Sequence, residues 1–253
     1  PTIGRFRAGD TLAAGVQQIQ DDVRRARQFA ISQRTTVYMV FCPSNFWGNG
    51  VWPNAAAFNL ATSDAAERAK ATNLYAKQLT GYAFVTLRSV GEQPGQQSPQ
   101  YLGKWSSLPE GVIIPAFKFN PPAAPPTRIY DPPLPANPPD QQVFDVFGFA
   151  VTNTIPFPSE DAYAPNRSYV WLPYLAFNHL GQLTVDGLTV AERDEFIPIA
   201  RGSVLHSRGA DKTPVQALPS LSENPPGNST NNFVLVRIDK LTGRARVVKQ
   251  ELQ

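Results

Sequence analysis

Apolar residues near the start of the chain recur at alternating spacings of four and three. They are Leu12, Val16, Ile19, Val23, Ala26 and Ala30. This spacing puts them on one continuous stripe of a helix of roughly five or six turns. Asp10 or Thr11, after Gly9, can accept hydrogen bonds from the unpaired N–H groups of a first helical turn. We therefore expect an amphipathic helix in the N-terminal segment, residues 1–34, beginning near Gly9.

The polar face of this predicted helix carries both signs of charge. Its residues are Asp21, Asp22, Arg24, Arg25 and Arg27. Asp21 and Arg25 are spaced to pair one turn apart, in the order that the helix dipole favours. Two interpretations stay open: a solvated face, or a contact surface for a partner subunit or a polyanion.

Most of the remaining chain has the pattern of strands. Thr36 to Cys42 is rich in β-branched and aromatic residues, and further strands are predicted at 82–87, 111–115, 143–151, 169–177, 196–205 and 233–239. Turn residues predict hairpins at 177–183 and 238–244. A second helix is expected at about 63–79, with Asp64 and Glu67 as a capping box and Gly81 as its stop. A helix followed by antiparallel hairpins indicates the α+β class.

Two regions read as insertions within one domain spanning residues 1–253. They lie at about 43–80 and 120–140, inside a β domain that covers residues 36–253. The second is dominated by proline, so we expect an extended, polyproline-like path at 121–139. The polar stretch at 213–232 is predicted to be another loop.

Composition narrows the class of protein. The chain has 253 residues, 25 prolines and a formal net charge of +3. Such a mild charge does not by itself indicate nucleic acid. Cys42 is the one cysteine, so no intrachain disulfide can form, and its apolar context predicts a buried small side chain. No stretch approaches the roughly 20 apolar residues that span a bilayer, and a chain that opens on Pro1 is expected to be an excised fragment.

The sequence contains few candidate catalytic or metal-binding residues. His179 and His206 have no metal-ligand spacing and are expected to be surface or hydrogen-bonded histidines. Nucleophile, phosphate-binding and metalloprotease motifs are absent from the sequence. The carboxylates of Asp186, Glu192, Asp194 and Glu195 offer oxygen ligands for calcium, although their spacing fits no EF-hand. The sequence thus predicts neither an enzyme nor a cofactor or small-molecule site, with calcium as the one open alternative.

Near the C-terminus, Gly243-Arg244-Ala245-Arg246 places two arginines two residues apart. On a continuing strand both would project to the same face. Arg237 and Lys249 could extend this basic surface and contact phosphates without reading base sequence. Polyanion contact by Arg244 and Arg246 is one hypothesis, and solvated strand arginines are the other.

Several segments together carry a resemblance. Asp22 to Ser32, leading into Thr36-Val37-Tyr38, resembles the end of the N-terminal helix of type IV pilin-like proteins, closest to minor pseudopilins of type II secretion (H class) and FimT-type pilins. Three further segments agree and lie in the family's order: 108–112, 177–181 and 241–247. The family's processing site and apolar half-helix are absent here, and the two insertions make this chain larger than a typical member.

The resemblance implies a fold and a function. In the family, a prepilin peptidase processes the N-terminus, the first half of the helix spans the inner membrane, and the second half packs on an antiparallel β domain. The mature protein joins a periplasmic or cell-surface filament with other pilin-like subunits. For this chain we expect a structural pseudopilin subunit, anchored in the bacterial inner membrane through a segment preceding Pro1.

The resemblance also suggests which residues act. Leu12, Val16, Ile19, Val23 and Ala26 would contact the sheet or neighbouring helices, and Arg24, Arg25 and Arg27 would form polar contacts at the base of the domain. Two alternatives stay open. FimT-type pilins that capture DNA carry a motif similar to Gly243–Arg246, and an adhesin or glycan-binding module could use Trp47, Trp52 and the proline-rich loops.

Overall fold

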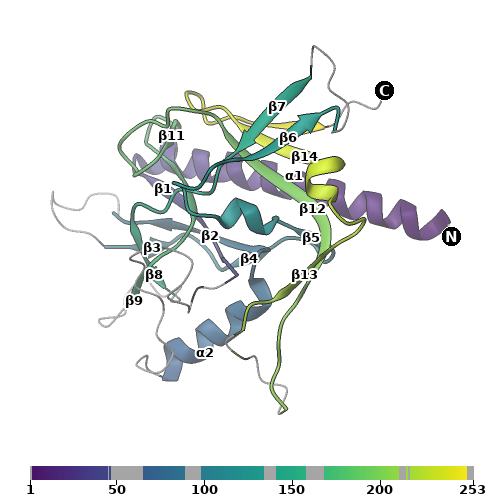
Figure 1. Ribbon diagram of the computed structural model, residues 1–253. Coiled ribbons are helices and arrows are strands. Elements are labelled where there is room, and N and C mark those ends of the chain that lie inside the picture. The colour runs from purple at the N-terminus through teal and green to yellow at the C-terminus, as the bar shows by residue number, and fades with distance from the viewer. Residues whose placement is uncertain are drawn as a thin grey trace.

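In a computed structural model, one long helix lies across two antiparallel sheets (Figure 1). The structure describes residues 2–44, 46, 65–88, 98–133, 141–157, 168–210, 215 and 217–249. The helix, α1, spans Thr2–Gln33. The helix begins before Gly9 to Thr11, so the start predicted there is wrong. A glycine inside a helix costs only about 1 kcal/mol and does not by itself end the helix. None of the described helices has the length and apolar character needed to cross a membrane.

The first sheet has the strand order β11-β10-β1-β2-β3, and β4 also pairs with β2. Its strands are β1 (Val37–Phe41), β2 (Gly81–Thr86), β3 (Gln100–Tyr101), β4 (Ser106–Ser107), β10 (Tyr174–Phe177) and β11 (Leu183–Thr184). Every residue of β1 is buried. This continuous burial follows from cover on both faces of the sheet, by α1 on one side and by α2 (Ala65–Leu74) and the β8–β9 pair on the other.

The second sheet has the order β13-β12-β14-β15, and β5 also pairs with β12. Its strands are β5 (Val112–Ile113), β12 (Glu195–Leu205), β13 (Ser220–Glu223), β14 (Val234–Ile238) and β15 (Ala245–Lys249). Two small antiparallel pairs complete the described strands: β6 (Thr127–Asp131) with β7 (Gln142–Val146), and β8 (Thr154–Phe157) with β9 (Ser168–Trp171). The mixed α+β class with antiparallel sheets is confirmed.

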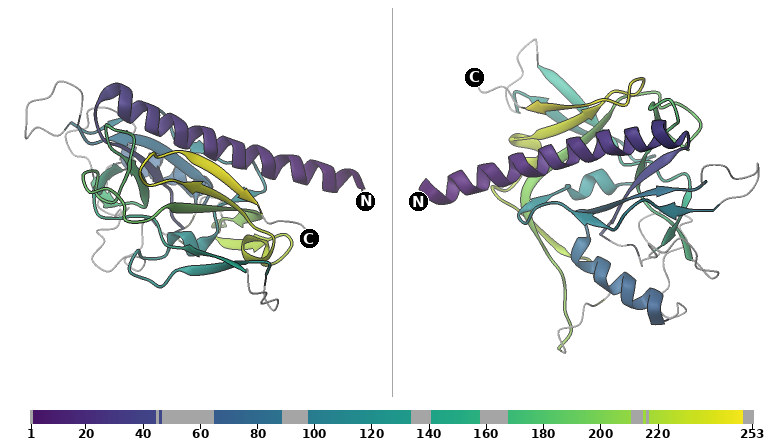
Figure 2. Two further views of the ribbon diagram at one scale, coloured as in Figure 1. Left: turned by 90° about the horizontal axis from the view of Figure 1, so that it is seen from above. Right: turned by 180° about the vertical axis from the view of Figure 1, so that it is seen from behind.

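The largest apolar cluster lies between α1 and both sheets. It joins Val23 of the helix to Met39 of the first sheet and to Val236 of the second. The helix therefore closes one core that the two sheets share. Seen from above and from behind, α1 runs along the outside of both sheets, and its first turns extend beyond them (Figure 2).

Several predicted boundaries differ from the structure. The second helix stops at Leu74 and continues as a 3-10 turn at Tyr75–Lys77, so Gly81 opens β2 instead of ending a helix. The single strand expected at 169–177 is divided between β9 and β10, because Pro173 has no N–H for a ladder and the chain changes sheets there.

The two predicted loops also contain regular structure. Strand β6 lies within the proline-rich 121–139 stretch, where it pairs with β7, so the purely polyproline-like path expected there is wrong. Strand β13 and the short helix α3 (Asn228–Asn231) lie within 213–232. In both places the strand pairs with a partner outside the predicted loop, β6 with β7 and β13 with β12, so the composition of the loop alone does not reveal the pairing.

Candidate functional site

The apolar stripe of α1 faces the chain's own core. Val16 is 5% exposed, and Ile19, Val23 and Ala26 are fully buried, while Leu12 is half-buried against the same cluster. Of the two contacts expected for these residues, with the sheet or with neighbouring helices, the structure contains the first. The surface that α1 leaves for a partner is its outer face and the flank beside β15.

One flank of α1 forms a groove with β15. The groove has a volume of about 840 Å³. It is lined by Gln20, Asp21, Arg24, Arg25, Arg27, Gln28, Phe29, Arg244, Ala245, Arg246 and Val247. The two basic groups that the sequence pattern singled out separately, on the helix and near the C-terminus, therefore meet in one place. We call this the arginine groove.

The arginines of the helix are held in three different ways. Asp21 pairs with Arg24 at 2.9 Å, whereas the spacing predicted a pair between Asp21 and Arg25. The Arg25 guanidinium lies 5.2 Å from the Phe29 ring centroid and 5.8 Å from that of Phe84. Arg27 donates from Nε to the Thr242 carbonyl at 2.7 Å. Arg25 therefore lies toward β2 and Arg27 toward the β14–β15 turn, and of the three only Arg24 is paired with a carboxylate.

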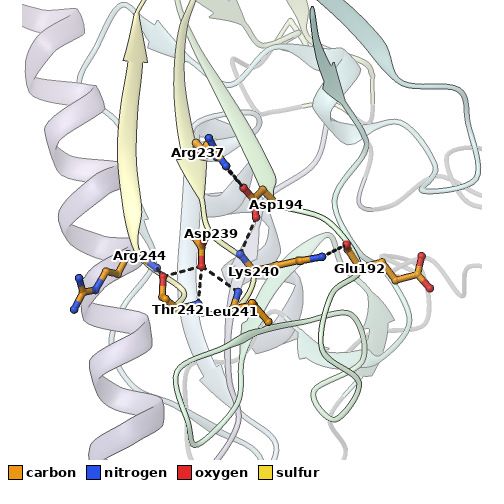
Figure 3. A network of polar contacts seen from close by, with 8 residues as sticks. All are labelled: Glu192, Asp194, Arg237, Asp239, Lys240, Leu241, Thr242 and Arg244. Atoms are coloured by element: carbon orange, nitrogen blue, oxygen red, sulfur yellow. Dashed lines mark hydrogen bonds and ion pairs between the residues drawn. The ribbon is translucent and has the colours of Figure 1, made fainter.

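The β14–β15 hairpin turn is fixed by an aspartate. Asp239 Oδ1 accepts from the N–H of Leu241 at 3.1 Å and from the N–H and hydroxyl of Thr242 at 2.7 and 2.8 Å (Figure 3). The Thr242 and Leu241 donors, together with nearby Arg237, hold the pKa of the Asp239 carboxyl below its usual value. The turn thus presents Arg244 and Arg246 from a rigid base, and both side chains are exposed.

Two glycines join this turn to the helix. Gly243, at φ +59°, lies so close to the turn at Gly181 that a Cβ would be 2.1 Å from the Gly181 carbonyl oxygen. A Cβ at Gly181, at φ +77°, would be 2.9 Å from Nε of Arg27. Three separate segments on which the pilin resemblance depends, around Arg27, Gly181 and Gly243, therefore meet at the end of the arginine groove.

The opposite flank of α1 is closed by a polar network with the first sheet. The Tyr82 hydroxyl donates to Asp22, and Gln18 Nε2 donates to the Tyr82 oxygen at 2.6 Å and to the Ser107 carbonyl at 2.9 Å. Burial, followed by the contact with Asp22, raises the pKa of Tyr82. This network leaves the hydroxyl protonated and satisfied, so the flank is a structural contact.

Three of the four carboxylates considered for calcium have separate protein partners. Asp186 accepts from the N–H of Thr189 and Leu188 in its own turn, and these bonds lower its pKa. Asp194 pairs with Arg237 at 2.6 Å, and Glu195 pairs with Lys118. Only the backbone carbonyl of Glu192 is in this network, where it accepts from Lys240 (Figure 3). Among the described residues no three potential ligands come together.

The remaining candidate residues are two histidines, one cysteine and two tryptophans. His179 is exposed in its turn, and His206 Nδ1 contacts Gln78 Oε1 at 2.8 Å, as surface or hydrogen-bonded histidines were expected to do. Cys42 is buried, and burial raises the pKa of its thiol. Trp47 and Trp52, the candidates for glycan binding, lie outside the described residues.

Sequence reasoning missed one buried charge. Lys118 is fully buried, pairs with Glu195, donates to the Phe147 carbonyl at 2.8 Å and lies 4.4 Å from the Phe149 ring centroid. Desolvation lowers its pKa. Lys118 follows Phe117 in an ordinary apolar stretch, so no local pattern distinguished it.

Comparison with known proteins adds no family. Protein-family models, curated proteins and solved structures were all searched without a match to this chain. The candidate site therefore depends on its own geometry.

Proposed function

We propose that this chain is the β-domain part of a pilin-like minor subunit that works by assembling with other helical subunits. The observation that carries the proposal is the arrangement of α1. One face of the helix is buried against both sheets, while its first turns extend beyond them (Figure 2). A helix held in this way can continue into a bundle of neighbouring helices while the β domain stays outside it.

The outer face of α1 suits close approach by another helix. Ala13, Ala14 and Gln17 are exposed there, and small side chains allow helix backbones to come close together. In this proposal the subunit is anchored in the inner membrane, its β domain lies in the periplasm or on the cell surface, and it has no enzymatic role.

The coding sequence upstream of Pro1 tests the anchor. The proposal predicts a short basic leader, then a processing site followed by about 20 apolar residues that continue the helix. An ordinary cleavable signal peptide at that place would contradict it.

Cross-linking in intact cells tests assembly. Because Cys42 is buried, a cysteine introduced by Ala14→Cys would be the reactive thiol among the described residues. We expect it to cross-link to other pilin-like subunits. Val143→Cys is the matched control, since Val143 is 48% exposed on β7, which covers the face of the second sheet away from α1. Equal absence of cross-links from both variants would contradict assembly through the helix.

Polyanion binding is the second candidate, favoured by the meeting of five arginines in the arginine groove. Duplex DNA bound there should be released as salt increases, because phosphate contacts displace counterions. A gel shift at two salt concentrations, unchanged by Arg244→Ala with Arg246→Ala, would exclude these arginines as its site.

A further inference from the structure

Strand β15 is an edge strand whose outward groups can be identified from its pairing. Asp239 N–H donates to the Arg244 carbonyl at 3.0 Å, which makes this a hydrogen-bonded pair of the hairpin. Such pairs alternate along an antiparallel ladder. Given the register Arg237 with Arg246, the backbone groups of Ala245, Val247 and Lys249 therefore point away from β14.

An independent contact agrees with this alternation. The Ala245 carbonyl accepts a hydrogen bond from Gln20 Nε2 at 3.1 Å, so it does point outward, toward α1. No described residue hydrogen-bonds the outward N–H and C=O of Val247 and Lys249. Val247 is half-buried and Lys249 is exposed. A row of unpaired backbone groups at a sheet edge is a template for another strand.

The charge beside this edge is strongly positive. Five arginines line the arginine groove, three from α1 and two from β15: Arg24, Arg25, Arg27, Arg244 and Arg246. Ala245 and Val247 pack against the cluster under α1, so Arg244 and Arg246 project from the opposite face of β15. Asp21 is the acidic residue among the lining side chains, and it is already paired with Arg24. No described residue forms a hydrogen bond or an ion pair with the side chains of Arg244 and Arg246. An occupant with carboxylates spaced along its length would complement this surface.

We propose that the arginine groove receives an extended, acidic segment of a neighbouring subunit, which adds to the free edge of β15 as a further strand. Main-chain hydrogen bonds to Val247 and Lys249 would supply affinity, and carboxylates facing Arg244 and Arg246 would supply selectivity. That the partner is a neighbouring subunit rests on the proposed function. The mode of binding rests on the edge and the charges alone.

Two other occupants fit less well. A nucleic acid backbone offers acceptors for the arginines but no regular donors for the outward carbonyls of a strand edge. A second copy of β15 would place its own arginines against these, and like charges that face each other across a ladder are destabilising. The acidic peptide uses both features of the groove at once.

A defined probe tests the mode of binding. It is a synthetic, fluorescent peptide of alternating glutamate and valine, whose carboxylates all lie on one face when it is extended. Titration with the whole chain, followed by fluorescence anisotropy, should show saturable binding. Methylating the backbone nitrogens of alternate residues, in either register, removes the N–H donors while keeping the charge. We expect one of these two methylated peptides to bind at least about tenfold more weakly.

Variants of the protein complete the test. Arg244→Ala with Arg246→Ala should weaken peptide binding about tenfold or more, whereas Arg128→Ala, an exposed arginine on β6, should leave it unchanged. Circular dichroism would establish that both variants are folded. Absence of peptide binding, equal binding of both methylated peptides, or tighter binding of duplex DNA than of the peptide would overturn the proposal.

The outcome is separable from that of the proposed function. The upstream coding sequence and the Ala14→Cys cross-link do not use the groove, so they can succeed when the peptide fails. If the peptide binds as predicted and the cross-link fails, the strand-addition site stands and its assignment to a neighbouring subunit is overturned.

Discussion

On the flank of α1 that faces β2, Asp22 and Gln18 satisfy the Tyr82 hydroxyl, whereas on the flank that faces β15 Arg244 and Arg246 have no partner among the described residues. The first flank uses its polar groups within the fold. The second keeps Arg244, Arg246 and part of a strand edge exposed, beside the contacts of Arg27 with Thr242 and of Gln20 with Ala245. A surface that contributes little to stability but is held by a rigid turn is typical of a binding site.

The buried stripe between the two flanks should give the largest effect. Ile19→Ala removes a fully buried side chain from the shared core, and we expect the free energy of unfolding to fall by about 2–5 kcal/mol. Urea denaturation measures this. Gln17→Ala, on the exposed face of the same helix, is the control and should change it by less than about 0.5 kcal/mol. Equal effects would mean that α1 does not pack as described.

The turn beneath the arginine groove comes next. Gly243→Ala puts a Cβ at positive φ and 2.1 Å from the Gly181 carbonyl oxygen, so the two turns must separate. We expect a loss of about 2–4 kcal/mol in the free energy of unfolding. Gly103→Ala is the control, because a Cβ there meets no atom within 4 Å. A neutral Gly243→Ala would show that the turns are not in contact.

The flank of α1 that faces β2 is tested by Tyr82→Phe. This change removes one hydroxyl and leaves Asp22 and Gln18 without their shared partner, so the free energy of unfolding should fall by about 1–3 kcal/mol. Thermal unfolding of the variant and the parent chain measures the difference. An unchanged midpoint would remove the distinction between the two flanks.

The flank of α1 that faces β15 should show the smallest effect on stability. Arg244→Ala with Arg246→Ala is expected to change the free energy of unfolding by less than about 0.5 kcal/mol, because exposed charges contribute little. Urea denaturation of this variant, compared with Tyr82→Phe, sharpens the comparison directly. A loss as large as that of Tyr82→Phe would assign these arginines to the fold instead of to a partner.

Local sequence patterns predicted the helices, strands and turns better than the contacts between them. The stripe from Val16 to Ala30 was readable because helical spacing and burial coincide, and the Gly181 and Gly243 turns were readable because each depends on its own few residues. The contact between Arg27 and the Thr242 carbonyl joins residues far apart in sequence, so no local pattern contains it.

The same distinction explains the errors. The residues at 169–177 have strand propensity on both sides of Pro173, and the tertiary structure sends β9 and β10 to different sheets. The arginine groove itself combines two basic groups that were each recognised, but their proximity depends on how β15 packs beside α1. Likewise, the free edge of β15 follows from ladder alternation, which requires the register to be known.

Amide hydrogen exchange at Val247 and Val248, measured by nuclear magnetic resonance, tests the central claim most directly. The Val248 N–H lies on the β14 side of the ladder and the Val247 N–H points outward, so Val248 should exchange slowly and Val247 quickly in the free protein. Adding the alternating glutamate–valine peptide should slow exchange at Val247 and leave Val248 unchanged. Slow exchange at Val247 before the peptide is added, or unaltered exchange with the peptide bound, would contradict the account.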